Sequence, residues 1–346
     1  IFDITDPSTM FMTSYWDSIG IFQGTAITKV VGDYAFLGGM EEGLVILDIS
    51  DPYSIQFVSH YIPDVNFPTA PTAGSTVPNA RGMWVENDLV YLAYDRGGFR
   101  IIDVSDVFNP VELSQYVNLS MDSVAAKAYN NVEVRSNYAF IPVDYCGLDI
   151  VDVSNPNLPV NAGWFNPWAC TFTNWLGGEG HTNEIEFVND SILFMTGGHH
   201  DLMVINVADP ANPIQVGSFG DHLDSLVAWG MDVQGSRVAL GYLDNLTNIP
   251  YDSKWGGFKI LEWSITTGVE EHDLNAIEVY PNPSNGVVSF KGDINNATFQ
   301  LYQLTGQLIL SGEMNQRLDF SSFDSGIYLL RIHSGKYSRT EKLIIE

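Results

Sequence analysis

Short apolar runs that end in an acidic or amide residue recur along the first three quarters of the chain. Full copies are GLVILDISDP from Gly43, GFRIIDVSDV from Gly98, GLDIVDVSNP from Gly147 and DLMVINVADP from Asp201; partial copies are IFDITDP from Ile1 and GFKILEW from Gly257. The equivalent acidic or amide positions are Asp3, Asp48, Asp103, Asp152, Asn206 and Glu262, spaced 45 to 56 residues apart. A run of this length, bounded by glycine and Asp-Pro turns, predicts a strand buried on both faces.

Each full unit contains further strand patterns around this run. In the second unit the order is RGMWVEN, LVYLAYD, the GFRIIDVS run and PVELSQYV, which predicts a four-stranded antiparallel sheet. Sheets that stack face to face around an axis bury both of their faces and leave few exposed edges. The pattern therefore predicts an all-β chain whose residues 1–265 form a β-propeller of five or six four-stranded blades.

The number of blades stays open, because the last unit ends at Trp263 without an outer strand of its own. In the five-blade arrangement, which we favour, Met10–Trp16 completes the last blade beside Gly257–Trp263, and Ile1–Thr5 is left over. In the six-blade alternative, the first blade lacks its two inner strands. Ile1 is neither a start methionine nor part of a charged and apolar export signal, so we expect a processed or incomplete N-terminus.

These units resemble the LVIVD repeat family, whose propellers occur in many surface proteins of bacteria and archaea. The resemblance covers almost all of residues 1–265. Long inserts around residues 66–77, 167–178 and 245–254 depart from the repeat. The resemblance implies a surface-exposed propeller.

The last seventy residues have a different pattern of short alternating strands separated by Pro-Asn-Pro, Thr-Gly and Ser-Gly turns. Such a pattern predicts a small Ig-like antiparallel β-sandwich over residues 277–346. A polar linker over residues 266–276 precedes it.

This segment resembles the C-terminal sorting domain of proteins exported by the type IX secretion system of Bacteroidetes. The motifs are YPNP followed by NG, LTGQ, GIYLLR and KLII, and the residues that carry them are Pro281, Asn282, Pro283, Gly286, Gly306, Gly326, Tyr328 and Lys342. The resemblance implies export across the outer membrane and recognition by the secretion machinery. It also implies removal of the tail and attachment of the remainder to surface lipopolysaccharide.

Charge separates the two parts of the chain. The net charge is −27, and the segment from Ile277 onward has seven acidic and six basic residues, which leaves about −26 on residues 1–276. So acidic a surface repels nucleic acid and anionic membranes and attracts cations or basic partners. We therefore exclude nucleic-acid binding, and no apolar run has the length of a transmembrane segment.

The repeated aspartates have a structural explanation. They stand where a strand ends and a turn begins, and short acidic side chains there accept hydrogen bonds from the turn backbone. The residues concerned are Asp48, Asp51, Asp103, Asp106, Asp152 and Asp209.

Histidines gather in one repeat unit, where they could approach one another at the face that carries the turns between second and third strands. The candidate ligands of a divalent metal, Ca²⁺ or Zn²⁺, are His181, His199, His200, Asp201 and His222. Their spacing matches no established zinc motif. The alternative is a set of polar loop histidines.

The starts of the inner strands bring other polar residues to the same face. Candidate ligand-binding residues are Asn79, Arg81, Asn131, His181, Asn183 and Trp229, with Asn130 beside them. Such groups bind a small ligand at a propeller mouth, or they satisfy backbone groups and hold water in the channel.

Two modifications follow from local sequence. Cys146 and Cys170 are the only cysteines, and an even count in an exported protein favours a disulfide. Four segments resemble the short O-glycosylation sequence of Bacteroidetes, with candidate serines Ser18, Ser123, Ser191 and Ser225.

Three function classes remain. We favour a secreted, non-enzymatic propeller, anchored at the cell surface and contacting proteins or glycans, because no nucleophile–base pair, catalytic carboxylate pair or cofactor motif is evident. The alternatives are a metal-dependent hydrolase or lyase on the propeller face and a structural subunit of an outer-membrane protein complex. All three are extracellular and associated with the cell surface or outer membrane.

Overall fold

The computed structural model describes residues 1–17, 24–71, 76–121, 127–167, 170, 181–197, 200–220, 226–244, 254–264, 277–292, 294, 297–334 and 337–346. The chain divides into two compact units, Ile1–Trp263 and Ser264–Glu346. The predicted linker, residues 266–276, lies outside the described residues. Apart from one 3-10 turn, η1 (Leu119–Met121), the regular elements of the described residues are all strands.

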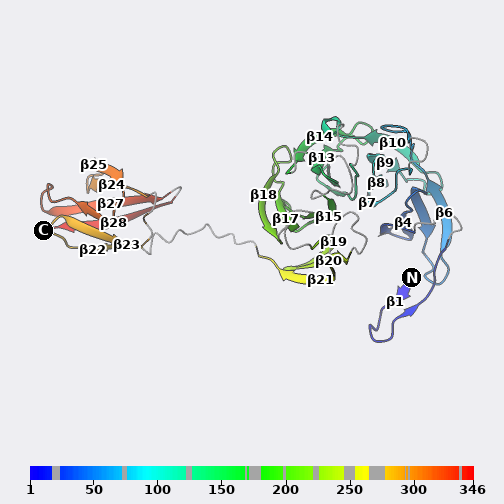
Figure 1. The fold of residues 1–346 in the computed structure, drawn as a ribbon, viewed down its shortest axis with the longest axis horizontal. Helices are drawn as coiled ribbons and strands as arrows, with labels where there is room; N and C mark the ends of the chain where they lie inside the picture. The colour runs from blue at the N-terminus through cyan, green and yellow to red at the C-terminus, as the bar shows by residue number, and fades with distance from the viewer. Residues whose placement is uncertain are drawn as a thin grey trace. The chain divides into compact units, whose positions relative to one another are not determined.

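In the first unit, a two-stranded N-terminal sheet precedes five larger antiparallel sheets, which are arranged around a common centre (Figure 1). We call them blades 1 to 5 in chain order. Blade 1 consists of β3 (Thr28–Val31), β4 (Tyr34–Gly38), β5 (Leu44–Asp48) and β6 (Gln56–Tyr61). Blade 2 consists of β7 (Gly82–Glu86), β8 (Leu89–Ala93), β9 (Phe99–Asp103) and β10 (Val111–Tyr116). Blade 3 consists of β11 (Glu133–Arg135), β12 (Tyr138–Val143), β13 (Gly147–Asp152) and β14 (Val160–Phe165).

The last two blades continue the same order. Blade 4 consists of β15 (Thr182–Phe187), β16 (Ile192–Gly197), β17 (His200–Asn206) and β18 (Ile214–Phe219). Blade 5 has three strands in the described residues, β19 (Ala228–Gln234), β20 (Arg237–Asp244) and β21 (Lys254–Glu262). The labelled first strands β7, β15 and β19 lie toward the centre, and the fourth strands β6, β10, β14 and β18 lie on the rim (Figure 1). The predicted propeller is therefore confirmed.

The N-terminal segment does not close the last blade in the predicted way. β1 (Phe2–Asp3) and β2 (Phe11–Met12) pair with each other, with Phe2 opposite Met12 and Asp3 opposite Phe11. The prediction that Met10–Trp16 pairs with Gly257–Trp263 is thus wrong for this structure. Pairing with its own sequence neighbour closes only a short loop, which costs less chain entropy than reaching the far end of the unit.

The repeated aspartates make the predicted turns. Asp48 Oδ1 accepts a hydrogen bond from the backbone N–H of Ser50 at 2.9 Å, and Asp51 Oδ1 accepts one from Tyr53 at 2.9 Å. Asp103, Asp106, Asp152 and Asp209 accept equivalent bonds. The Ser50 hydroxyl and backbone N–H lower the pKa of Asp48, because both stabilise the charged carboxylate.

Blades 1 to 4 each bury one face of the third strand against the next blade. Leu44 and Ile46 of β5 are fully buried in a cluster that contains Met83 and Leu92 of blade 2. Phe99 and Ile101 of β9 pack in the same way on blade 3. We call these apolar contacts between neighbouring blades seams. At about 25 cal/mol per Å² of buried apolar surface, the seams supply the main stabilisation of the ring.

Hydrogen bonds supplement the apolar seams both near the inner strands and at the rim of the propeller. Ala80 N donates to Met40 O at 2.9 Å between blades 1 and 2, near the inner strands. On the rim, Ser59 Oγ donates to Val107 O at 2.5 Å, and Ser114 Oγ donates to Pro156 O at 2.6 Å. Successive blades are therefore held in one fixed register.

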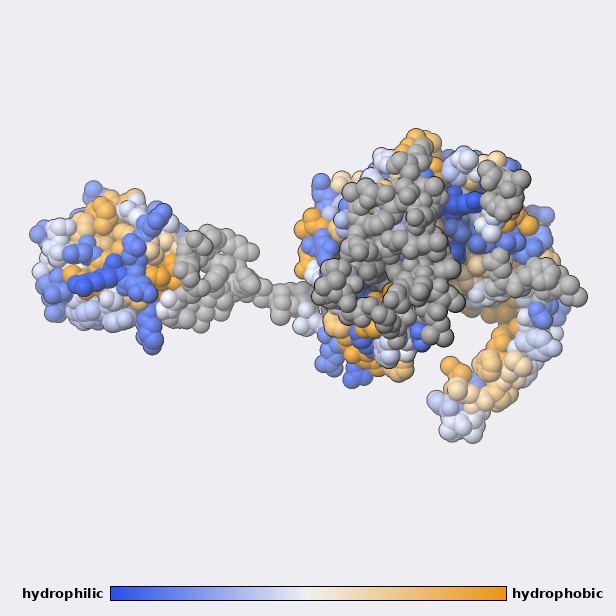
Figure 2. All heavy atoms as spheres, viewed as in Figure 1, coloured by the Kyte–Doolittle hydropathy of each residue, from blue (hydrophilic) through white to orange (hydrophobic). Residues whose placement is uncertain are grey.

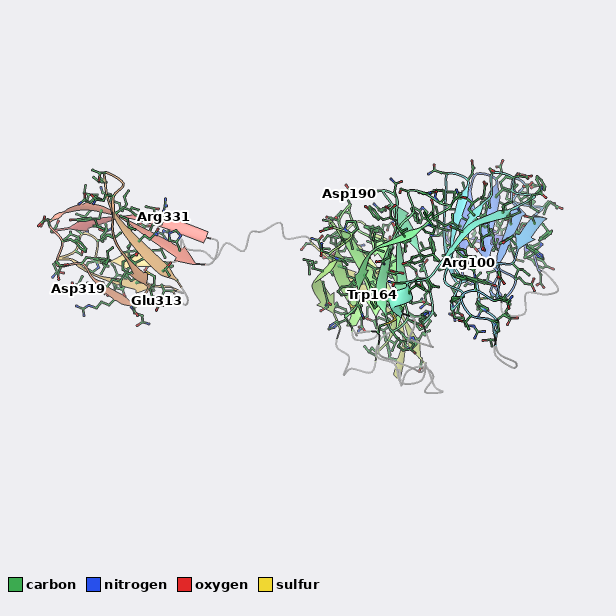
Figure 3. All side chains as sticks on the ribbon, turned by 90° about the horizontal axis from the view of Figure 1, so that it is seen from above. Arg100, Trp164, Asp190, Glu313, Asp319 and Arg331 are labelled. Carbon is green, nitrogen blue, oxygen red and sulfur yellow. A yellow bond between two sulfur atoms is a disulfide. The ribbon has the colours of Figure 1, made fainter. Side chains whose placement is uncertain are left out.

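Two third strands carry a fully buried charged residue at the third position of the repeat. Arg100 of β9 is fully buried within the propeller (Figure 3). Its guanidinium donates to Asp64 O at 2.9 Å and to Gln115 Oε1 at 2.8 Å, and it lies 3.2 Å from Glu112 Oε1. These partners come from the segment after β6 and from β10, so Arg100 joins blades 1 and 2.

Asp149 occupies the equivalent position in β13 and is also fully buried. Its Oδ1 accepts hydrogen bonds from Asn118 Nδ2 and Asn161 Nδ2, both at 2.9 Å. Burial raises the pKa of Asp149 to about 7, since the charged form loses its hydration; the amide hydrogen bonds offset part of that shift.

The second unit is a two-sheet β-sandwich. One sheet has the order β22–β23–β26, with β22 (Glu278–Tyr280), β23 (Val287–Lys291) and β26 (Arg317–Asp319). The other has the order β25–β24–β27–β28, with β24 (Thr298–Gln303), β25 (Leu308–Glu313), β27 (Gly326–Ser334) and β28 (Tyr337–Ile345). A core of buried residues that includes Val288, Leu301, Phe320, Leu330 and Leu343 lies between the sheets.

Asp149→Asn should make the stability of the protein less dependent on pH. Between the ordinary pKa of 3.8 and about 7, the folded protein holds a proton on Asp149 that the unfolded chain has lost. The free energy of unfolding of the wild type therefore falls by up to about 1.4 kcal/mol per pH unit across this range, and the variant lacks this slope. Urea unfolding at pH 5 and pH 7.5 measures the difference; equal slopes in the two proteins would contradict the buried carboxyl.

Candidate functional site

A cavity of about 400 Å³ lies where the inner strands of all five blades meet. Its lining residues are Ile27, Lys29, Trp84, Asn131, Val132, Glu133, Arg135, Glu184, Ile185, Glu186, Phe187, Met231 and Asp232. Successive side chains in a strand point to opposite faces, so β15 alternates half-buried Glu184 and Glu186 with buried Ile185 and Phe187. The cavity is therefore charged and apolar at once.

The two carboxyl groups of β15 that line the cavity have raised pKa values. Burial raises the pKa of Glu184 to about 7, while the hydrogen bond from Asn131 and the charge of Lys29 lower it. Burial, followed by the neighbouring charge of Asp232, raises the pKa of Glu186 to about 7. Both glutamates therefore change charge near neutral pH.

The two basic residues of the cavity already have partners. Arg135 Nε lies 3.1 Å from Glu133 Oε1, and its guanidinium lies 4.7 Å from the centre of the Phe187 ring. Lys29 Nζ lies 5.5 Å from the centre of the Trp84 ring. Among the described residues, no basic side chain forms an ion pair with Glu186 or Asp232. The unbalanced charge of the cavity is thus negative.

The predicted ligand-binding residues take part in several separate contacts. Asn79 donates to Asp95 Oδ2 at 3.3 Å, and Arg81 Nε lies 3.7 Å from the same atom. Asn183 Nδ2 donates to Trp229 O at 2.9 Å, which joins blades 4 and 5.

Asn130 and Asn131 join blades 3 and 4. Asn130 Nδ2 donates to Thr182 O, and Asn131 Nδ2 donates to Glu184 Oε2, each at 2.5 Å. Of the six predicted ligand-binding residues, Asn131 lines the cavity. The other cavity residues were missed, although the alternation of polar and apolar residues in TNEIEF and GMWVE indicates one polar face on each inner strand.

The predicted metal ligands do not form a cluster in the part of the chain that the structure describes. His181 Nδ1 lies 3.1 Å from Asp144 Oδ2, and Tyr145 OH lies 2.8 Å from His181 Nε2. His200 Nδ1 lies 3.1 Å from Gly220 O. No group of three or more His, Cys, Asp or Glu among the described residues could hold a metal ion. His199 and His222 lie outside the described residues.

Asp201, the remaining predicted ligand, is buried and belongs to another contact. Its Oδ2 accepts a hydrogen bond from Tyr242 OH at 2.6 Å and lies 3.4 Å from Lys259 Nζ. The ammonium group of Lys259 also lies 4.5 Å from the centre of the Tyr242 ring. Asp201 thus joins blades 4 and 5.

A disulfide joins Cys146 to Cys170, with a Cα–Cα distance of 4.4 Å, which is the pairing that the cysteine count favours. Trp164 Nε1 donates to Cys146 O at 2.6 Å. The bond therefore fastens Cys170 to the turn between β12 and β13.

Of the four candidate glycosylation serines, the structure describes Ser191, in the turn between β15 and β16. Its hydroxyl donates to Asn189 Oδ1 at 3.3 Å, and its side chain is half-buried. Ser18, Ser123 and Ser225 lie outside the described residues. O-glycosylation remains a prediction.

The sorting-motif residues build the sandwich. Asn282 Nδ2 donates to Lys342 O at 2.6 Å, and Asn282 Oδ1 accepts from Ile344 N at 2.9 Å. One side chain therefore bonds a carbonyl group and an amide group of β28. Tyr328 OH donates to Asp324 O at 2.7 Å, and Gly326 begins β27. Pro281 and Pro283 flank Asn282 in the turn that presents it.

Two glycines of the motif adopt positive φ. Gly286 has φ +94°, and a Cβ there would lie 2.5 Å from Ser321 Cα. Gly306 has φ +86°, and a Cβ there would meet nothing within 4 Å. Both positions need glycine for its backbone conformation, and Gly286 also needs the absence of a side chain.

Family models match both parts of the chain. The LVIVD repeat matches residues 26–62, 79–118 and 128–166, which correspond to blades 1 to 3. The secretion system C-terminal sorting domain matches residues 278–346. The propeller thus contains three LVIVD repeats and the C-terminal unit is a type IX secretion sorting domain, which marks the chain as a secreted protein associated with the cell surface. Among the described residues, no helix is long and apolar enough to cross a membrane.

Solved structures with a similar fold include PorZ, described as an essential bacterial surface component of the type IX secretion system of Porphyromonas gingivalis. It is 13% identical with a TM-score of 0.42, over 92% of this chain and 51% of PorZ, so the chain spans about half the length of PorZ. A protein from Lactobacillus plantarum is 11% identical with a TM-score of 0.47, over 83% of each chain. The chain matches none of the curated proteins.

Asp232→Asn should lower the pKa of Glu186, because the substitution removes the neighbouring charge that opposes ionisation of Glu186. Titration of the Glu186 side-chain carbon by NMR measures the shift. Asp106→Asn, on the rim, is the control and should leave the titration unchanged. An unchanged pKa of Glu186 in Asp232→Asn would show that the two carboxyls are not coupled.

Gly286→Ala should destabilise the sorting domain more than Gly306→Ala. Both substitutions force a side chain into positive φ, which costs about 1 kcal/mol. At Gly286 the overlap with the Ser321 backbone adds to this cost, for a total of about 3 kcal/mol. Hydrogen exchange of the β27 amides in the full chain measures both values, and equal losses would contradict the close approach.

Proposed function

We propose that this protein is a non-enzymatic binding module, displayed on the cell surface, that contacts a partner protein or glycan through the central cavity of its propeller. The sorting tail accounts for its export. The proposal concerns what the propeller does once it is outside.

The cavity is the observation that supports binding most directly. All five blades contribute to it, and it combines the Trp84 ring and the Met231 side chain with the carboxylates of Glu184, Glu186 and Asp232. Sugar hydroxyls and basic side chains both donate hydrogen bonds to carboxylates, and both present apolar surface to an aromatic ring. Its unbalanced negative charge favours a ligand that carries donors or positive charge.

The enclosed position of the histidine network supports a non-enzymatic role. Tyr145, His181 and Asp144 form a chain of contacts that resembles an acid–base relay, but all three side chains are buried. A catalytic base must come within hydrogen-bond reach of its substrate. Here the relay bonds instead to Asn130 and Thr182, which it holds at the junction of blades 3 and 4.

The same proposal includes attachment of the propeller to the cell surface, which depends on the sorting tail. The secretion machinery recognises the sandwich, cleavage occurs in the linker of residues 266–276, and the propeller is attached to surface lipopolysaccharide. The division of the chain into two compact units is consistent with removal of one without loss of the other.

Binding of the full-length protein to outer-membrane glycans and proteins from its own source cells tests the cavity. We expect Trp84→Ala and the double variant Glu186→Gln/Asp232→Asn to weaken binding about tenfold or more, equivalent to about 1.4 kcal/mol. Phe108→Ser, at an exposed position on the rim, is the matched control and should bind like the wild type.

Equal binding by the cavity variants would contradict the role of the cavity. Stable co-purification with an outer-membrane complex, unaffected by these variants, would instead support the structural-subunit alternative. Metal-dependent turnover of a substrate would contradict a non-enzymatic function.

A further inference from the structure

Blade 5 exposes the side chains that the other blades bury at the same positions. The residue after the turn glycine, or after Asp201 in blade 4, is Leu44, Phe99, Leu148 or Leu202, and each is at most 4% exposed. Phe258 is the equivalent in blade 5 and is 71% exposed. Two residues further on, Ile260 is 61% exposed, whereas Ile46, Ile101 and Ile150 are fully buried and Val204 of blade 4 is half-buried.

The difference arises because blade 5 is the last blade of the described residues, so no following blade packs on these side chains. In blades 1 to 4 these positions pack on the inner two strands of the next blade, as Leu44 does on Met83 and Leu92. Figure 2 shows apolar surface at the fifth blade and along the N-terminal hairpin. We call the surface formed by Phe258 and Ile260 the open flank.

The N-terminal hairpin has the local structure of the outer half of a blade. Asp3 Oδ1 accepts from Thr5 N at 2.9 Å, as Asp48 Oδ1 does from Ser50 N. Asp6 Oδ1 accepts from Ser8 N at 2.9 Å, as Asp51 does from Tyr53. Residues 1–9 therefore repeat the paired turns that join a third strand to a fourth.

The hairpin also contacts blade 1 in the way that one blade contacts the next. Ser14 Oγ donates to Pro52 O at 2.7 Å. The same bond joins Ser59 to Val107 between blades 1 and 2, and Ser114 to Pro156 between blades 2 and 3. Thus β1–β2 stands in register before blade 1, as blade 1 stands before blade 2.

Exposed apolar side chains surround the place before blade 1 where the inner two strands of a blade would lie. Phe2 and Ile4 of the hairpin are 63% and 64% exposed. On blade 1, Val30 of β3 is 60% exposed, and it alternates with Lys29, which faces the cavity. With the open flank, these residues leave an apolar space next to the hairpin, where the other blades have their first two strands.

We propose that this space is the seat of a sixth blade, with β1–β2 as its outer half and a two-stranded antiparallel hairpin of this protein, preceding Ile1, as its inner half. Chain continuity favours this occupant over a second copy. In blades 1 to 4 the second strand leads into the third through a short turn, as β4 (Tyr34–Gly38) leads into β5 (Leu44–Asp48). The inner hairpin is apolar on both faces, because one covers Phe258 and Ile260 and the other covers Val30.

A designed extension tests the seat directly. Ile1 is the equivalent of Ile46, so a copy of residues 24–45 placed before Ile1 supplies the inner pair of a blade in the correct register. We expect this extension to raise the unfolding midpoint by about 4 °C or more and to reduce binding of a hydrophobic dye. The matched control has the same extension with the positions of Ala35, Leu37 and Val45 changed to serine, and should give neither effect.

The double variant Phe258→Ser/Ile260→Ser separates the seat from general stabilisation. It should lower the unfolding midpoint of the extended chain and leave that of the chain beginning at Ile1 nearly unchanged. Mass spectrometry of the protein isolated from its source cells should find residues before Ile1. An extension without effect, a native chain that begins at Ile1, or burial of Phe258 by dimerisation would each overturn the proposal.

Discussion

The structure depends on one constraint: a β-sheet that is apolar on both faces is stable only between two neighbours. Leu44 and Ile46 of blade 1 are buried against Met83 and Leu92 of blade 2, and the third strands of blades 2 to 4 are buried in the same way against the blade that follows. The central cavity is a result of this packing, because sheets that meet side by side bring their inner strands close to an axis without filling it. The ligand site that we propose is therefore formed by the ring as a whole.

Polar residues make the seams different from one another. The third residue of the repeat is Val45 in blade 1, Arg100 in blade 2, Asp149 in blade 3, Met203 in blade 4 and Lys259 in blade 5. Arg100 has Glu112 beside it, Asp149 has Asn118 and Asn161, and Lys259 has Asp201. Arg100, Asp149 and Asp201 are buried charges, and a buried charge is stable only beside a neighbour that satisfies it, so these contacts distinguish one seam from the next although the backbones are alike.

The fold could be predicted from sequence to a large extent, because the determinants are local and repeated. Strand length, the Asp-Pro turns and the period of the GLVILDIS run are all visible in the chain, and the sandwich follows from its turns. The seams could not be predicted, since the partners of Arg100 come from two different blades. The cavity was missed for the same reason: Glu186 and Asp232 lie far apart in sequence and meet only in the ring. The strand pattern wrongly predicts closure by Met10–Trp16, because the pattern alone does not show that β2 pairs with β1 in a short hairpin.

The position of the last strand has a consequence for protein synthesis. β28 contributes Leu343 and Ile345 to the core of the sandwich, pairs along its length with β27, and is held by the side chain of Asn282. The sandwich cannot complete its core until β28 has left the ribosome. A chain that is truncated before β28 therefore lacks both the partner strand of β27 and part of this core, and its tail cannot fold.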